Sequence, residues 1–239
     1  MVSEPLHGFL LHRRAYRETS YLTDIFTLEL GKLSAVVKGV RGNKGDKKSL
    51  LQSFQPLYLT ISGKHELRNL NQLESAGGMF QLSDSQLFCG MYLNELLNRL
   101  LPNEVPHPEL YAHYQNSLVE LQSGCDIEPC LRQFELLLLD DLGYGIDLTH
   151  DYQDGKAIEP NRDYCFVLEQ GIKAVDLSFK GRHRFSGEAL LHMSEQRWDP
   201  QSLKCAKYIA RSALAHLLGH KPLKSRELFQ QTWVTGTSK

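Results

Sequence analysis

Residues 8–40 have the sequence GFLLHRRAYRETSYLTDIFTLELGKLSAVVKGV. Within this stretch, three runs rich in Leu, Val, Ile, Phe, Tyr and Thr are separated by the short polar pairs Arg17-Glu18 and Gly31-Lys32. Runs of this composition, bounded by turn residues, predict β-strands over Gly8–Arg14, Tyr21–Leu28 and Leu33–Val40. The chain is therefore expected to begin with a β-domain.

The strand pattern continues beyond this stretch. A longer polar loop precedes Phe54–Ser62, after which Ser62-Gly63-Lys64 predicts a hairpin turn into Glu66–Glu74. Five short strands within the first 75 residues favour a small closed barrel. Closure removes the exposed edges that an open five-stranded sheet would present.

From Leu82 onward the spacing of apolar residues becomes helical. Four helices are predicted from capping residues or prolines at their starts and from glycines or prolines at their ends. They run from Ser83-Asp84 to Pro102, from Glu109 to Gly124, from near Glu128-Pro129 to Gly143, and from Asp199-Pro200 to Gly219. A short terminal helix capped by Ser225 is expected to follow.

Residues 145–185 show no single period. Tyr164–Leu168 and Ile172–Val175 flank Glu169-Gln170-Gly171 and predict a small hairpin. The expected fold class is α+β, with a five-stranded barrel in residues 1–80 and a mainly helical domain in residues 81–239. The hairpin segment, about 145–185, is expected to be an insertion in the helical domain.

The formal net charge of −1 hides an uneven distribution. Residues 1–80 hold 11 Lys and Arg against 7 Asp and Glu, residues 81–160 hold 3 against 14, and residues 161–239 hold 13 against 7. This layout indicates localised charged surfaces, with cations towards both ends of the chain and an acidic segment between them.

Motifs of enzymes and of membrane proteins are missing from the sequence. No P-loop, G-x-G-x-x-G or G-x-S-x-G occurs, and the five cysteines form no C-x-x-C pair. We expect no catalytic site, no cofactor and no bound metal. No apolar run approaches about 20 residues, and the first residues lack a basic signal region, so a cytoplasmic protein is expected. The alternative is a metal-dependent nuclease or phosphoesterase that uses Asp140, Asp141, His150 and Asp151.

A basic, glycine-rich loop is the main candidate for binding DNA. Five cations fall within eleven residues of it, and glycines let a phosphate backbone approach closely. The residues expected to contact DNA are Arg13, Arg14, Lys38, Arg41, Lys44, Lys47 and Lys48. Tyr16, Tyr21, Phe54 and Tyr58 could stack on bases, although packing in the core is favoured for them. The alternative for the loop is a solvated surface.

Two further sites are candidates for partner contacts. Arg132, beside Leu136, could pair with Glu128 or Glu135 of its own helix. It could also receive a carboxylate from a partner peptide whose apolar residues enter a pocket. A possible basic edge near the C-terminus comprises Lys204, Lys207, Arg211, Lys221, Lys224 and Arg226.

Six stretches in order resemble the RecO family of bacterial recombination mediators. They are Tyr16–Ser20, Val37–Arg41, Leu51–Phe54 with Pro56, Tyr92–Leu96, Arg132–Leu136 running to Leu142-Gly143-Tyr144, and Leu223–Phe229. The resemblance covers essentially the full chain. It implies an N-terminal OB-fold and a helical C-terminal domain.

The resemblance also implies a function. Such proteins bind single- and double-stranded DNA, anneal complementary strands and bind RecR. They recognise the acidic C-terminal tail of single-stranded-DNA-binding protein, and so help RecA load onto covered DNA; the protein would associate with the nucleoid during repair. Tail binding would fall on Arg132 and Leu136. Many relatives carry a Cys-rich zinc site after the Leu-Gly-Tyr motif, but residues 145–163 contain no Cys, so we predict no zinc.

Overall fold

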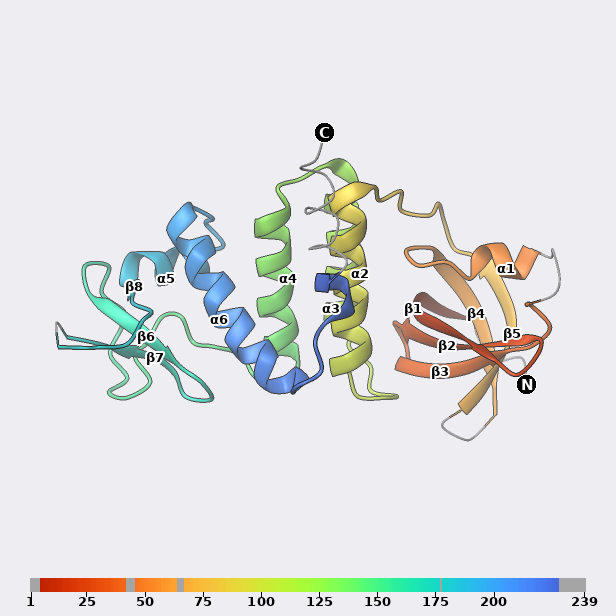
Figure 1. Cartoon of the computed structure of the whole chain (residues 1–239), viewed down its shortest axis with the longest axis horizontal. Coiled ribbons are helices and arrows are strands. Elements are labelled where there is room, and N and C mark those ends of the chain that lie inside the picture. Colours follow the sequence, from red (N-terminus) through yellow and green to blue (C-terminus); the bar gives the residue numbers. More distant parts are fainter. Residues whose placement is uncertain (1–4, 42–45, 64–66, 177, 228–239) are drawn as a thin grey trace. The chain divides into compact units, whose positions relative to one another are not determined.

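The computed structural model describes residues 5–41, 46–63, 67–176 and 178–227 (Figure 1). Internal contacts group the chain into two compact units. The first comprises the described parts of Met1–Cys125 and Pro222–Lys239, and the second is formed by those of Asp126–Lys221. The α+β expectation is confirmed, with a closed five-stranded barrel followed by mostly helical structure and a small sheet.

The barrel belongs to the first unit. Its strand order is β1-β2-β3-β5-β4, and all neighbours are antiparallel except the parallel pair β3 and β5. This parallel pairing closes the barrel and is not visible in the strand pattern of the sequence. The strands are β1 (Leu6–Tyr16), β2 (Ser20–Thr27), β3 (Gly31–Val37), β4 (Pro56–Ser62) and β5 (Leu67–Ser75).

Alternation along the strands builds the barrel core. Leu33, Ala35 and Val37 of β3 all point inward and are buried, together with Leu10 and Ile25 of the two preceding strands. A short helix, α1 (Asp46–Leu50), lies in the segment predicted to be a loop.

Two helices of the first unit pack against the barrel. These are α2 (Asp84–Leu100) and α3 (Pro108–Ser123). Phe9 lies edge-on to Tyr114 with ring centroids 5.2 Å apart, and Phe26 lies 5.3 Å from Tyr111. All four rings are buried, and both tyrosines belong to α3, so α3 shares an apolar contact with the barrel. Helix α2 contacts the barrel through Asn94, whose side-chain amide donates to the carbonyl oxygen of Leu10 at 3.4 Å.

The second unit combines three helices with a small sheet. The predicted hairpin gains a third strand, giving the order β7-β6-β8, and a further helix follows it that the sequence did not predict. Buried residues of the sheet, α5 and α6 form one core. The elements are α4 (Ile127–Asp141), β6 (Asp163–Val167), β7 (Gly171–Ala174), β8 (Phe185–Ser186), α5 (Gly187–Ser194) and α6 (Pro200–Leu218).

Capping residues fix where the helices begin. Asp199 caps α6, accepting from the backbone N–H groups of Gln201 and Ser202, as the sequence predicts. Helix α4 begins slightly before the predicted start, since Asp126 is its cap. The prediction that Ser225 caps a terminal helix is wrong: a helical turn already begins at Lys224, and Ser225 lies within it. The rest of that predicted helix lies outside the described residues.

Candidate nucleic-acid interface

A cavity of about 600 Å³ opens on the barrel beside the turn that joins β1 to β2. Residues of that turn, of β3 and its end, and of the start of β5 line it. Arg17 makes the turn possible by taking a left-handed conformation, with a φ of 51°. The lining residues are Tyr16, Arg17, Glu18, Thr19, Ser20, Val36, Lys38, Leu67, Arg68 and Asn69.

Strand register explains why these separate stretches meet. Leu22 of β2 pairs with Arg14 of β1 and with Val36 of β3, and Val36 pairs in turn with Asn69 of β5. Paired residues of neighbouring strands point to the same side of a sheet. None of the four belongs to the barrel core, so they form a row on its outer face. The exposed Arg14 thus lies in the same row as Val36 and Asn69, which both line the cavity.

Hydrogen bonds tie the beginning of the basic loop to this turn. The backbone N–H groups of Val40 and Arg41 both donate to the carbonyl oxygen of Thr19, at 2.9 and 3.1 Å. The guanidinium of Arg41 also donates to the carbonyl oxygen of Arg17, at 2.7 Å. The loop therefore starts from a fixed position at the cavity rim.

The cations at the cavity differ in how far their charge is already compensated. Lys38 is exposed and makes no ion pair with another described residue. Arg17 is also exposed, and its guanidinium carbon lies 5.2 Å from the ring centroid of Tyr16. Arg68, in contrast, is bound by Glu104 at 2.6 Å. Lys38 and Arg17 are therefore the lining cations that remain available to a phosphate.

Arg13 lies apart from this cavity. Its guanidinium donates to the carbonyl oxygen of Leu51 and lies 5.3 Å from the ring centroid of Tyr21. These contacts join β1 to the segment after α1. Both arginines are exposed, but Arg13 is held by these contacts, whereas Arg14 lies in the row beside the cavity.

Two more cations of the predicted DNA-binding set, Lys47 and Lys48, lie on α1. Lys47 and Lys48 are exposed, and the ammonium group of Lys47 donates to the carbonyl oxygen of Asn71 at 2.9 Å. Lys44 lies outside the described residues. Of the seven predicted residues, Lys38 lines the cavity, and Arg14 and Arg41 lie next to it.

The four candidate stacking aromatics have different surroundings. Phe54 is buried, and Tyr21 is half-buried against the barrel core. Tyr58 is exposed but lies edge-on to the ring of His7, with centroids 4.8 Å apart. Only Tyr16 of the four lines the cavity, which makes it the aromatic best placed to meet a base.

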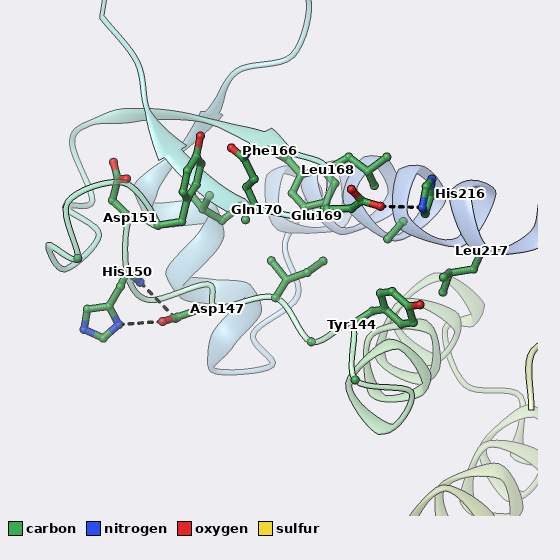
Figure 2. A pocket seen from close by; sticks show the side chains of 18 residues that line it. Tyr144, Asp147, His150, Asp151, Phe166, Leu168, Glu169, Gln170, His216 and Leu217 are labelled. Carbon is green, nitrogen blue, oxygen red and sulfur yellow. Dashed lines mark hydrogen bonds and ion pairs between the residues drawn. The ribbon is translucent and has the colours of Figure 1, made fainter. Parts of the chain in front are cut away.

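Two residues of the alternative metal-dependent site, His150 and Asp151, line a different cavity, of about 650 Å³, in the second unit (Figure 2), whereas Asp140 and Asp141 do not line it. Asp147 and His150 point toward each other, 3.1 Å apart, while Asp151 extends away from them (Figure 2). Asp151 is buried and accepts from the backbone N–H groups of Gln153 and Ala174, both at 2.7 Å. Asp151 therefore supports local backbone structure.

These acidic residues do not converge on one point. In the described part of the chain, no set of three potential ligands that includes Asp140, Asp141, His150 or Asp151 brings its ligand atoms within 4.8 Å of one another. On the far side of the cavity, Glu169 of the β6–β7 turn pairs with His216 at 2.8 Å (Figure 2). The geometry therefore gives the nuclease alternative no support.

Comparison with known proteins identifies the family. The model described as "Recombination protein O N terminal" matches residues 1–79, and the one described as "Recombination protein O C terminal" matches residues 85–227. The chain belongs to the RecO family. It is 55% identical to DNA repair protein RecO of Pseudoalteromonas atlantica over 233 residues, covering 97% of this chain and 96% of that protein. Identity to the proteins of the same name from Alteromonas mediterranea and Haemophilus influenzae is 46% and 42%, over 96% and 97% of this chain and 98% of each relative.

Arg132, on α4, is buried in the second unit. The Arg132 side chain is only 8% exposed and its guanidinium lies 2.9 Å from the carboxylate of Glu135. Glu128, the other possible partner on α4, instead pairs with Lys207 at 2.8 Å. The positive charge of Arg132 is thus already matched within its own helix.

Leu136, one turn further along α4, lines a cavity of about 320 Å³ in the second unit. Apolar side chains such as Met193 and Trp198 share the lining with Leu136, while Asp140 and Asp147 add acidic groups. Arg132 is not among the lining residues. Leu136 therefore has an apolar pocket beside it, but the pocket and the guanidinium of Arg132 are separate.

The six cations of the possible C-terminal edge are divided between the two units. Lys204, Lys207, Arg211 and Lys221 belong to the second unit, and Lys224 and Arg226 to the first. Arg226 lies over the ring of Tyr92, 5.7 Å from its centroid. The cations of α6, in contrast, line a cavity of their own.

The sequence did not predict that Arg68 and Asn69 line the barrel cavity. Both belong to β5, which reaches the cavity through its parallel pairing with β3. No spacing in the sequence signals which strands will pair in parallel. As to membranes, no helix in the described ranges has both the length and the apolar character needed to span a bilayer.

Proposed function

We propose that this chain is a DNA repair and recombination mediator. In this role it binds single- and double-stranded DNA and anneals complementary strands. Together with RecR it helps load RecA onto DNA covered by single-stranded-DNA-binding protein. Membership of the RecO family supports the general role, since the relatives named above are DNA repair proteins.

The single observation that carries DNA binding is the cavity on the barrel face. Arg17 and Lys38, which form no ion pair with another described residue, line this cavity together with the ring of Tyr16, and the exposed Arg14 lies beside it. Small five-stranded barrels bind oligonucleotides on the face of strands 2 and 3 and on the adjoining loops. In such a groove, cations follow the phosphates and an aromatic ring stacks on a base.

We assign the two ends of the chain different tasks. Residues 1–80 form the proposed DNA-binding domain, in which Lys44, Lys47 and Lys48 extend the contact from the cavity along the basic loop. Residues 81–239 form the proposed partner-binding domain. The acidic middle segment, residues 81–160, keeps DNA away from its own surface through charge repulsion.

Recognition of the tail of single-stranded-DNA-binding protein is proposed for Arg132 and Leu136. The apolar side chains that line the pocket beside Leu136, such as Met193 and Trp198, suit the apolar end of such a tail. Because Arg132 is buried and bound to Glu135, an acidic tail has to compete with Glu135 for the guanidinium. Binding of the tail is therefore coupled to rearrangement of this ion pair.

Strand annealing tests the proposal, since it requires no hydrolysis. Purified protein is mixed with two complementary labelled oligonucleotides without nucleotide or metal, and duplex formation is followed by fluorescence transfer. The proposal predicts faster annealing with the wild type and a loss of that acceleration in the double variant Arg14→Glu with Lys38→Glu. Lys156→Glu, which reverses a side chain that is 70% exposed in the second unit, is the control. Equal annealing by both variants would contradict the barrel assignment.

A further inference from the structure

A second basic cavity, of about 730 Å³, lies in the second unit between α6 and the stretch 182–186 that leads through β8. Five Lys or Arg residues line it: Arg182, Arg184, Lys204, Lys207 and Arg211. No Asp or Glu is among its lining residues. This concentration of charge is local, because the protein as a whole has a formal net charge of −1.

Three of these five cations have no counter-ion in the part of the chain that the structure describes. Lys207 is paired with Glu128 at 2.8 Å, and Arg184 lies 3.5 Å from Asp163. Arg182, Lys204 and Arg211 are exposed and form no ion pair with any other residue that the structure describes. Like charges held close together repel each other, so such a cluster is stabilised when an anion binds between them.

The three cations of α6 form a row. Lys204, Lys207 and Arg211 are spaced by three and four residues, which places them on one face of the helix. The row is about 10 Å long, at about 1.5 Å per residue. Consecutive phosphates of a single strand are separated by six backbone bonds, so a row of this length is long enough to meet about two of them.

A pair of stacked rings lies within the same cavity. The ring of His183 lies over that of Tyr208, with centroids 3.9 Å apart and an angle of 30° between the planes. Tyr208 also contacts Phe185, which belongs to the buried core, so the stack has a rigid base. His183 is exposed and its outer face is available to another flat group. An acidic peptide would use the cations alone, whereas a nucleic acid would use the cations and the stack.

We propose that this cavity is a second binding site for a single DNA strand, separate from the barrel face. The phosphates lie along the α6 row and one base stacks on His183. The inference deepens the proposed function by adding a site, and it rests on that function for the choice of DNA as the ligand. A protein that holds strands at two sites can bring complementary sequences together.

Charge reversal in the intact protein tests this site. The double variant Lys204→Glu with Arg211→Glu is compared with Lys156→Glu with Arg197→Glu, whose side chains are 70% and 61% exposed in the same unit and do not line the cavity. Both pairs change the net charge equally. Binding of a labelled mixed-sequence 20-nucleotide strand is followed by fluorescence anisotropy, and a thermal melt verifies that each variant is folded. If Lys204→Glu with Arg211→Glu does not fold, Lys204→Gln with Arg211→Gln takes its place.

The cavity variant is expected to bind the strand at least tenfold more weakly than the control pair. The slope of log affinity against log salt should fall by about 1.4, because each phosphate contact contributes about 0.7 for a single strand. His183→Ala should weaken binding by roughly fivefold without changing the slope, since base stacking is not an ionic contact. Crosslinking of a bromodeoxyuridine-labelled strand should occur in the peptides that contain His183 or Tyr208.

Two outcomes would overturn the inference. One is equal binding of the strand by the cavity variant and the control pair. The other is unchanged strand binding together with lost binding of a poly-glutamate peptide, which would assign the cavity to an acidic protein partner. Neither outcome involves the barrel residues. Failure of the barrel assignment would be seen separately, as unchanged DNA binding and annealing in Arg14→Glu with Lys38→Glu.

Discussion

The carboxylate of Glu95 on α2 holds Ser225 near the end of the described chain, accepting from its backbone N–H at 2.9 Å and from its hydroxyl at 2.7 Å. The backbone N–H of Lys224 donates to the other carboxylate oxygen at 3.0 Å. Arg99 adds a further link by donating to the carbonyl oxygen of Pro222 at 3.1 Å. Two stretches that carry the family resemblance, separated by more than a hundred residues, therefore contact each other within the first unit.

Removing this carboxylate should weaken the first unit. Glu95→Ala leaves three donors without their acceptor, and hydrogen bonds to charged groups contribute about 1.5–3 kcal/mol each, with much of the loss offset by water at this partly exposed position. We expect a decrease of about 1–3 kcal/mol in the free energy of unfolding in urea. Glu74→Ala, on the exposed side of β5, is the control and should change it by less than about 0.5 kcal/mol.

The same contact should depend on pH. Burial by itself raises the pKa of Glu95, but hydrogen bonds from Ser225 and Lys224 and the charge of Arg99 hold it below the ordinary 4.5. A carboxyl whose pKa is lower in the folded state stabilises that state above its unfolded pKa, and this contribution is lost as the pH falls. The stability difference between wild type and Glu95→Gln should thus be constant near neutral pH and shrink below about pH 4.5. A difference that grows on acidification would contradict the described contact.

Gly31 and Gly39 form a matched pair for testing the barrel turns. Both have positive φ, 69° and 70°, but an added Cβ would lie 1.8 Å from the carbonyl oxygen of Val105 at Gly31 and in open space at Gly39. Gly39→Ala should cost about 1–2 kcal/mol of folding free energy, from backbone conformation alone. Gly31→Ala should cost more, since the backbone around Val105 must also move. Urea unfolding of the two variants compares them directly, and equal losses would be inconsistent with this packing.

The phenol of Tyr114 offers a test of the contact between barrel and helices. Its hydroxyl donates to the amide oxygen of Asn94 at 2.6 Å, and burial strongly raises its pKa. Tyr114→Phe leaves this buried acceptor unpaired, at an expected cost of about 1–3 kcal/mol. Tyr58→Phe, at an exposed ring, should be nearly neutral. The free energy of unfolding of each variant provides the comparison.

Arg132 and Leu136 can be tested with the tail peptide of single-stranded-DNA-binding protein. Arg132→Ala alone leaves Glu135 as a buried charge without this partner and should destabilise the second unit by several kcal/mol. Arg132→Met with Glu135→Gln removes both charges and keeps the side-chain volume. This double variant and Leu136→Asp are each expected to weaken binding of the peptide at least tenfold and to leave DNA affinity unchanged. Unaltered peptide binding in both would refute the assignment.

Local signals in the sequence predicted most of the secondary structure. Runs of strand-forming residues bounded by turn residues located the five barrel strands, and Asp199-Pro200 and Gly219 located both ends of α6. These features depend on neighbouring residues only. The parallel pairing of β3 with β5, the added strand β8 and helix α5 depend on contacts with distant segments, and the sequence did not reveal them.

The candidate sites, like the fold, were predicted where neighbouring residues determine them and missed where distant contacts do. The basic loop after Lys38 was recognised from composition, but charge density does not reveal that Arg13 is bound to Leu51 or that Arg132 is buried against Glu135. The basic cavity of the second unit is lined by Lys204, Lys207 and Arg211, which the sequence predicted as part of a basic edge. It is also lined by Arg182, Arg184 and the stacked rings of His183 and Tyr208, which the sequence did not predict. Folding brings these two stretches together across about twenty residues of intervening chain.

The salt dependence of DNA binding tests the central claim, that the barrel face binds the phosphate backbone. The affinity for a single strand is measured between 50 and 200 mM salt, roughly, for the wild type and for Arg14→Glu with Lys38→Glu. The account predicts that log affinity falls steeply with log salt for the wild type, and that the double variant binds more weakly with a slope shallower by about 1.4. A wild-type slope near zero, or the same slope and affinity in both proteins, would contradict it.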